Sequence, residues 1–366
     1  MRTETSNGVT IKYPEAIAFC FNRCPIVVSG DNASQMKVTI SSKGKTSEHY
    51  IDAHKGKCQD DVRQYIHSFL DGEISEEMYY TPNGYPTNLG RNFDFSVMVF
   101  NEEGNRLVSF GFDVYYIWGA LQLGKKYTLN GYRRLTWFRN FPFSFSLYNE
   151  QENTIIYAPN GRLNDFVEID TDGLMEFCPN LPSDAKTLSV YDYSGRITQA
   201  TFDLSFDLTF YLKTGDQKKL LDIEIDDHTE GTYLRWINRY GQYCYYLFCE
   251  GSRTTKASAT TSFLRDDLSQ YDDTYGYHGE YGNRTNYARE DVLPLCAPMV
   301  DRDTFDFLQE IATAVIVDKY CGKDENGKDK WMGVQIQPAS YTKDFRKQLQ
   351  DFEFNMVLPP VDNQEL

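Results

Sequence analysis

Short stretches in which apolar and polar residues alternate recur along this chain, and glycine-containing turns separate them. In the segment FDFSVMVF (93–100), Phe93 and Phe95 share one face with the two valines that follow at the same spacing, while Asp94 and Ser96 point the other way. This period of two predicts antiparallel sheets with one solvent-exposed face. The other segments with strand character are residues 16–21, 25–30, 36–41, 187–193, 202–212 and 220–225.

Helical periodicity is confined to two stretches. Residues 60–70 place apolar side chains at spacings of three and four after Asp60 and Asp61, and residues 301–315 do the same with Asp301 or Asp303 as the candidate cap. Aromatic residues make up 15% of the chain, a bias that favours pleated surfaces. We therefore expect a mostly β fold of two, or at most three, antiparallel β-sandwich-like domains with one or two short helices.

The length of 366 residues exceeds the usual span of one hydrophobic core. The loop-like stretch PNLPSDAK (179–186) separates two strand-rich halves and predicts a boundary near residue 180. We expect an N-terminal β-rich assembly domain over 1–180 and a C-terminal β-rich domain over 181–366. The second domain contains a segment rich in Tyr, Asp, Gly and Thr, 251–291. It is far longer than a typical connection of about 4–6 residues, so we expect a long loop there.

The stretch TYLRWINRYGQYCYYLF (232–248) predicts a β-hairpin with Gly241 at positive φ in its turn. We expect Trp236 to anchor a core, and Arg235 and Arg239 to be the outward contacts of the hairpin. One face of the first strand carries Tyr233, Arg235 and Ile237, and the other carries Leu234 and Trp236.

The C-terminal region predicts three more strands. Residues 315–321 and 331–337 flank a charged Asn-Gly turn, and residues 349–359 alternate again. The last strand is expected to be held by pairing. Pairing with the preceding hairpin in one subunit and pairing across subunits are both compatible with the sequence.

The charge balance argues against nucleic acid as a direct partner. Lys and Arg total 37 against 53 Asp and Glu, a net charge of −16 that repels phosphate backbones. The first residues lack the basic and apolar regions of a secretory signal, and no run approaches the ~18 apolar residues of a membrane helix. We expect a protein made in a cytosol, without membrane insertion.

Motifs for metals, cofactors or catalysis are weak. The 8 cysteines include no CxxC pair and the 5 histidines are scattered, so we expect no metal site, no cofactor and no catalytic residues. The cysteines are expected to be reduced and mostly buried, although an oxidising exterior would permit a disulfide. Acidic clusters at 168–173, 224–231 and 263–273 are expected to form turns rather than a glycosidase pair or a calcium loop. We expect no enzyme, with polysaccharide cleavage as the catalytic alternative.

The Tyr-rich segment is the candidate contact site. Tyrosine and arginine are enriched at protein interfaces, which favours docking against a neighbouring subunit. A flat ring also stacks on the apolar face of a sugar, so glycan binding is the second interpretation, and disorder or intramolecular packing is the third. The candidate contacts are Tyr271, Tyr275, Tyr277, Tyr281, Arg284 and Tyr287.

Four segments together resemble a family of virion-associated tail or baseplate proteins of Bacteroides-type tailed phages and prophages, a family with no assigned chemistry. They are NGYRRLTWFRNFPFSFSLY (130–148), EGTYLRWINRYGQYCYYLF (230–248), YHGEYGNRTNYARED (277–291) and KDFRKQLQDFEFNMVLPPVDNQEL (343–366). The resemblance implies a virion protein made in the host bacterial cytoplasm.

From this resemblance we expect a structural tail-tip or baseplate component of the distal-tail type. Such a component would form a homo-oligomeric ring and contact other tail or baseplate proteins. The alternative is a receptor-binding module of a tail or head fibre that recognises host surface polysaccharide. Both placements are analogies at the level of fold.

Overall fold

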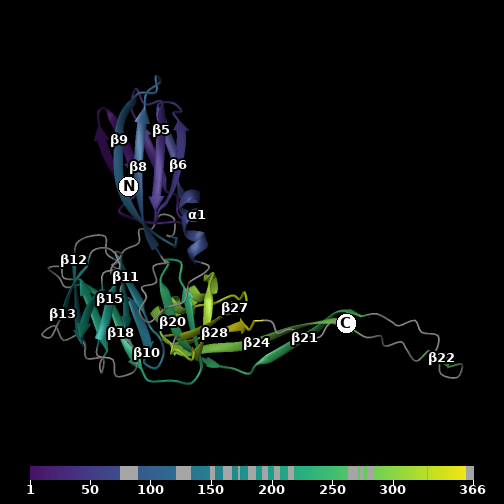
Figure 1. Ribbon diagram of the computed structural model, residues 1–366. Coiled ribbons are helices and arrows are strands. Elements are labelled where there is room, and N and C mark those ends of the chain that lie inside the picture. The colour runs from purple at the N-terminus through teal and green to yellow at the C-terminus, as the bar shows by residue number, and fades with distance from the viewer. Residues whose placement is uncertain are drawn as a thin grey trace.

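The computed structural model describes residues 1–74, 90–120, 133–148, 153–159, 167–171, 174–179, 187–191, 197–201, 207–212, 218–262, 271–272, 276–277, 284–327 and 329–359. The described residues are mostly β, with several largely antiparallel sheets and short helices. The expected fold class is therefore confirmed. Figure 1 shows the strands gathered into three lobes, with a long two-stranded ribbon projecting from the last one.

The N-terminal lobe is a β-sandwich. One sheet has the order β1 (Arg2–Ser6), β2 (Val9–Tyr13), β4 (Pro25–Ser29), β7 (Lys57–Asp61). The other has the order β3 (Ile17–Phe19), β9 (Arg106–Ile117), β8 (Gly90–Phe100), β5 (Gln35–Ser42), β6 (Lys45–Asp52). In β8, Phe93 and Phe95 are buried and Asp94 is exposed, as the alternation predicts.

Helix α1 (Arg63–Ile74) packs against this sandwich through buried Ile66 and Phe69. The Phe69 ring meets the edge of Phe93 with centroids 5.6 Å apart. Asp61 Oδ1 accepts the backbone N–H of Arg63 at 3.3 Å, at the start of the helix. The helix predicted over 60–70 is thus present, and it begins at Arg63.

The middle lobe also consists of two sheets. The first has the order β10 (Arg133–Phe138), β18 (Lys218–Asp226), β17 (Leu208–Leu212), β12 (Asn153–Pro159), β13 (Val167–Thr171). The second has the order β11 (Phe145–Tyr148), β14 (Leu174–Pro179), β15 (Thr187–Tyr191), β16 (Ile197–Thr201). Phe145 from one sheet meets Phe210 from the other at a centroid distance of 5.2 Å.

The boundary expected near residue 180 falls inside this lobe. Strands β14 and β15 lie on either side of it, and they pair antiparallel with Cys178 opposite Ser189. Strand β10 likewise pairs with β18 across it, with Leu135 opposite Ile223. A division at 180 would separate paired strands, so the strand pairing divides the chain before β10 and after β18 instead. The stretch that suggested the boundary, 179–186, lies in the chain between two strands that pair with each other.

The C-terminal lobe is built on one large sheet. Its order is β26 (Asp329–Gly333), β25 (Val317–Lys323), β19 (Thr232–Ile237), β20 (Tyr243–Glu250), β24 (Arg284–Val300), β28 (Gln350–Val357), β27 (Gln335–Ile336). Strand β21 (Thr254–Ser262) pairs with β24, and β22 (Tyr271–Asp272) pairs with β23 (Gly276–Tyr277). The terminal strand predicted over 349–359 is β28, and it lies between β24 and β27 of the same chain.

Helix α2 (Arg302–Gln309) and the 3-10 helix η3 (Glu310–Thr313) pack against this sheet. The Asp301 side chain caps α2 by accepting the backbone N–H of Thr304 at 2.8 Å. Phe305 meets the edge of Phe352 on β28 at 5.3 Å between centroids. The helix predicted over 301–315 and one of its two candidate caps are confirmed.

Strand β19 of the β19–β20 hairpin is buried on both faces. Every residue of β19 is buried. Tyr233 and Ile237 belong to the core shared with the N-terminal and middle lobes, whereas Leu234 and Trp236 belong to a second core beneath α2 and β28. The predicted hairpin and the role of Trp236 as a core anchor are confirmed, and the hairpin is a wall common to two cores.

The hairpin turn also forms the joint with the N-terminal lobe. Asn238 Oδ1 accepts the backbone N–H groups of Tyr240 and Gln242, each at 3.0 Å. Beyond the end of β9, Ala120 donates its N–H to the carbonyl of Arg239 at 2.6 Å. Gly241 has φ +72, and a Cβ there would lie 2.6 Å from the carbonyl oxygen of Trp118. The joint therefore requires glycine for two independent reasons.

We predict that Gly241→Ala destabilises the protein more than Gly104→Ala. Gly104 has φ +80 with nothing within 4 Å of its ideal Cβ, so alanine there meets only backbone strain of about 1–2 kcal/mol. At Gly241 the contact with the Trp118 carbonyl adds a further ~1–3 kcal/mol. Urea denaturation of both variants measures the difference. Equal losses of unfolding free energy would contradict the tight joint.

Candidate functional site

The segment 254–292 forms an arm rather than an irregular loop over its described ends. Strands β21 and β24 pair antiparallel from Thr254 opposite Val292 to Ser262 opposite Arg284. Figure 1 shows this ribbon leaving the C-terminal lobe, with β22 at its far end. Side chains 254–258 on β21, and Arg289 and Glu290 on β24, are all exposed. Both faces of this part of the arm thus meet solvent.

The sequence gives no sign of the arm, because the described side chains of its β21 strand, residues 254–258, are all exposed. The β21 residues TTKASATTS contain no apolar alternation, which is the pattern that marks a half-buried strand. Threonine favours extended backbone, but that preference alone is a weak signal. The expectation of one long loop is therefore wrong for both ends of the segment, which are paired strands.

The structure places four of the six candidate contacts on backbone of the arm. Tyr271 on β22 lies opposite Tyr277 on β23. Arg284 lies opposite Ser262, and Tyr287 lies opposite Ala259, on the β21–β24 ribbon. The remaining two, Tyr275 and Tyr281, are outside the described residues.

Asp291 holds the root of the arm. Its side chain is 5% exposed. It accepts hydrogen bonds from Thr255 Oγ1 at 2.6 Å, from Arg253 Nη2 at 2.5 Å and from Arg289 Nε at 3.2 Å. The Thr255 hydroxyl and the two guanidinium groups hold the pKa of the Asp291 carboxyl well below its usual value. The backbone carbonyl of Asp291 also accepts the N–H of Leu358, 3.0 Å away. The arm therefore leaves the body from a fixed register.

A cleft of about 400 Å³ lies beside this root, within the size range of small-molecule sites. Its walls come from β24, β28 and the chain after β27. The lining residues are Gly251, Pro294, Leu295, Cys296, Gln337, Pro338, Ala339, Glu353, Phe354 and Asn355.

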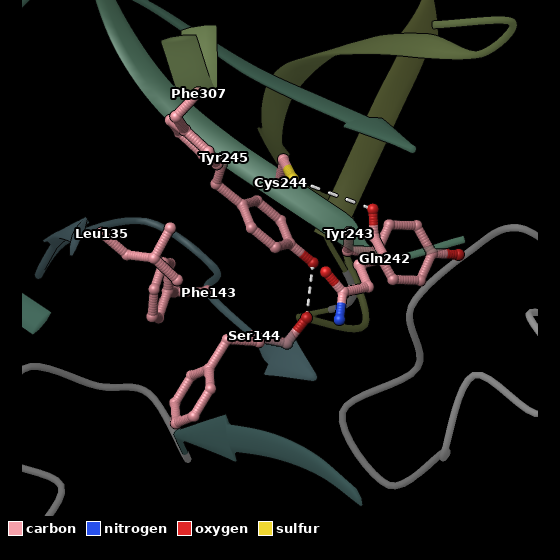
Figure 2. Close-up of a pocket in the computed structure, with 9 residues that line it drawn as sticks. Leu135, Phe143, Ser144, Gln242, Tyr243, Cys244, Tyr245 and Phe307 are labelled. Atoms are coloured by element: carbon pink, nitrogen blue, oxygen red, sulfur yellow. Dashed lines mark hydrogen bonds between the residues drawn. The ribbon is translucent and has the colours of Figure 1, made fainter. Parts of the chain in front are cut away.

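A second cavity, between the middle and C-terminal lobes, is too small for a ligand. Its volume is about 10 Å³, close to the space of a single water molecule. Figure 2 shows the Ser144 and Tyr245 hydroxyls meeting there, with Oγ and OH 2.8 Å apart. Leu135, Phe143 and Phe307 supply apolar walls. The cavity lies within the contact between the two lobes, and it is not a substrate site.

Arg235 is a buried structural residue, not the outward contact that the sequence suggests. Its side chain is 1% exposed, and its Nη2 lies 2.7 Å from Asp318 Oδ2, on the neighbouring strand β25. The guanidinium lies 4.2 Å from the ring centroid of Trp331 and 5.1 Å from that of Tyr243. Arg239, in contrast, is exposed as expected.

The described cysteines are divided between buried and surface positions. Cys20, Cys24, Cys58 and Cys244 are buried, and Cys249, Cys296 and Cys321 lie at or near the surface. Across the described ranges, three or more His, Cys, Asp or Glu side chains do not gather in a way that would hold a metal ion.

Within the described ranges, every helix is too short or too polar to cross a membrane.

No protein-family model matches the chain, and no curated protein matches it. Among solved structures, the chain is similar to a 1.5-MDa bacterial ice-binding adhesin at 12% identity and a TM-score of 0.18, covering 89% of this chain and 95% of that chain. It is also similar to a titin structure at 12% identity and a TM-score of 0.19, covering 60% of this chain and 99% of that chain. TM-scores this low do not establish a common fold.

We predict that Asp291→Asn loosens the root of the arm without unfolding the body. Losing the carboxylate charge weakens the contacts to Arg253 and Arg289, so amide hydrogen exchange over residues 254–258 should accelerate by roughly twofold to fivefold. Because the pKa is depressed, the native contribution is complete above the unfolded-state value of about 4 and is lost as pH falls towards the folded value.

The matched control is Glu290→Gln, which removes an exposed neighbouring carboxylate whose Lys256 partner is 3.5 Å away. It should leave exchange at the root unchanged. Equal acceleration in both variants would assign the effect to general surface charge rather than to the Asp291 contacts.

Proposed function

We propose that this protein is a structural assembly subunit and that the β21–β24 arm joins it to a neighbour. The observation that carries the proposal is the two-stranded ribbon with both faces exposed along its described root-proximal part. An isolated two-stranded ribbon is marginally stable in water, and it becomes stable when a further strand or surface covers it. An arm of this kind gains most from binding another chain.

Open strand edges favour a strand-addition mode of contact. In the described part of the chain, β21 pairs with β24 alone, so the backbone groups along its other edge are available. β-Strand addition uses such groups for affinity and uses alternate side chains for specificity. A second copy of this chain is the partner we favour, because repeated head-to-tail contacts of one arm close into a homo-oligomeric ring.

The proposed setting is a phage virion, at the tail tip or baseplate, with other tail or baseplate proteins as further partners. The sequence resemblance to virion-associated proteins supports this setting, and the three β-rich lobes are compatible with it. In this setting the lobes form the ring body, and the arm reaches the next subunit. No catalytic step is part of the proposal.

Shortening the arm tests the proposal. Residues 258–288 are replaced by Asn-Gly, which joins Ala257 to its register partner Arg289 and keeps the Asp291 contacts. We expect the full chain to form a defined ring in mass photometry and the shortened chain to be monomeric with an unchanged melting temperature. A matched control replaces the exposed turn 324–327 between β25 and β26 in the same way, and it should retain the ring.

Two outcomes would reject the assembly role. One is a full-length chain that stays monomeric at micromolar concentration, alone and with tail proteins. The other is a ring that survives shortening of the arm.

The arm favours a second candidate, binding of host surface glycan or receptor at its tip. The observation behind it is that Tyr271 and Tyr277 occupy directly opposed positions on the paired strands β22 and β23, and Figure 1 shows β22 at the far end of the arm. Paired tyrosines at the end of a ribbon are suited to stacking on sugar rings.

For this candidate, we predict that Tyr271→Ala with Tyr277→Ala abolishes binding of labelled protein to host cells while the melting temperature stays constant. Tyr50→Ala is the control, since Tyr50 is 60% exposed on β6 of the N-terminal lobe. Binding that persists in the double variant removes the tip from consideration.

A further inference from the structure

Two cysteines face each other across the strands at the root of the arm. Cys249 on β20 lies directly opposite Cys296 on β24, so both side chains project from the same side of the sheet. The N–H of Gly251 donates to the carbonyl of Pro294 at 2.8 Å. Hydrogen-bonded pairs alternate along an antiparallel ladder, so Cys249 and Cys296 form another such pair, with Cα atoms about 5.5 Å apart. Disulfides span Cα distances of about 4.4–6.8 Å.

Both thiols lie on the outer side of the sheet. Their chain neighbours Phe248 and Leu295 point the other way, into the core beneath α2. Cys249 is exposed, while Cys296 is half-buried and lines the cleft beside the arm. A small reagent can therefore reach Cys249 from solvent, with Cys296 as its immediate neighbour.

We propose that Cys249 and Cys296 form a thiol–disulfide exchange site that reacts with small-molecule disulfides of the glutathione type. The Cys249 thiolate attacks one sulfur of oxidised glutathione, the S–S bond breaks, and one glutathione thiolate leaves and takes up a proton. The Cys296 thiolate then attacks the Cys249 sulfur and expels the second glutathione. Two cysteine thiols are oxidised to one disulfide, and one glutathione disulfide is reduced to two thiols.

The order of the two steps follows from the surroundings of Cys296. Burial, together with the carboxylates of Glu353 and Asp351 and the neighbouring Cys249, raises the pKa of the Cys296 thiol to about 11. Its thiolate fraction is small at neutral pH and rises about tenfold with each pH unit. Cys249 is therefore the entry point, and closure of the disulfide accelerates as pH rises.

The bond would lock the root of the arm. It joins β20 to β24 and closes a loop that contains the whole arm. Opposed Cβ atoms lie about 4.5–5.5 Å apart in such pairs, slightly beyond the ~3.5–4.5 Å of a relaxed disulfide. The strands must draw together to form it, so the disulfide should be easily reduced.

The test uses the reduced full-length protein. It is incubated with oxidised glutathione, quenched with N-ethylmaleimide and analysed by intact mass and non-reducing peptide mapping. We expect a peptide linked through Cys249 and Cys296, a net loss of two hydrogens and no retained glutathione at that site. Closure should be faster at mildly alkaline than at neutral pH. Cys296→Ser should stop at a mixed disulfide on Cys249.

Cys321 is the matched control within the same chain. It is exposed on β25, and neither neighbouring strand, β19 or β26, contains a cysteine. It should stop at the mixed disulfide. A wild-type protein that retains glutathione on Cys249 at every pH, or that links Cys249 to a cysteine other than Cys296, would overturn the proposal. This result is independent of the ring assay, so the two proposals fail separately.

Discussion

Burial of strand β19 on both faces is the constraint on which the rest of the structure depends. A strand with one wet face can tolerate polar residues at every second position, but β19 has no such position, since all its residues are buried. Tyr233 packs on Phe141 of the middle lobe at 4.4 Å between ring centroids, while Trp236 packs on Phe307 of α2 at 5.3 Å. The turn between the strands holds the N-terminal lobe through Gly241. One short hairpin thus contacts all three lobes.

A strand buried on both sides also explains the position of Arg235. A charged group in such a strand has no route to solvent, so it needs a carboxylate and further favourable contacts. Asp318 supplies the charge, and the Trp331 and Tyr243 rings cover the guanidinium. The apolar neighbours on both sides of Arg235 were a readable sign of burial in the sequence. The partner was not readable, because register between β19 and β25 depends on tertiary pairing.

Prediction from sequence succeeded where one face of an element is buried and failed where neither face is. The alternation in β8 and β28 and the apolar stripe of α2 identify these elements directly, because burial selects their residue types. The described side chains of β21, residues 254–258, are all exposed, so burial does not select apolar residues at every second position of this strand. The boundary near 180 failed for a related reason: a stretch with two prolines resembles a linker in sequence, and only the pairing of β10 with β18 shows that the lobe continues past it.

The polar character of the arm limits the register specificity and the affinity of any contact that it makes. A two-sided polar ribbon has no hydrophobic pattern to define its register, and the pairing of β21 with β24 shifts between Ala259 and Ser262. The Asp291 contacts at the root counteract this freedom by fixing where the ribbon starts. Because such a ribbon presents little apolar area, each contact through backbone edges alone would be weak. Under the proposed function, affinity must then come from repetition around a closed ring, where every subunit both gives and receives an arm.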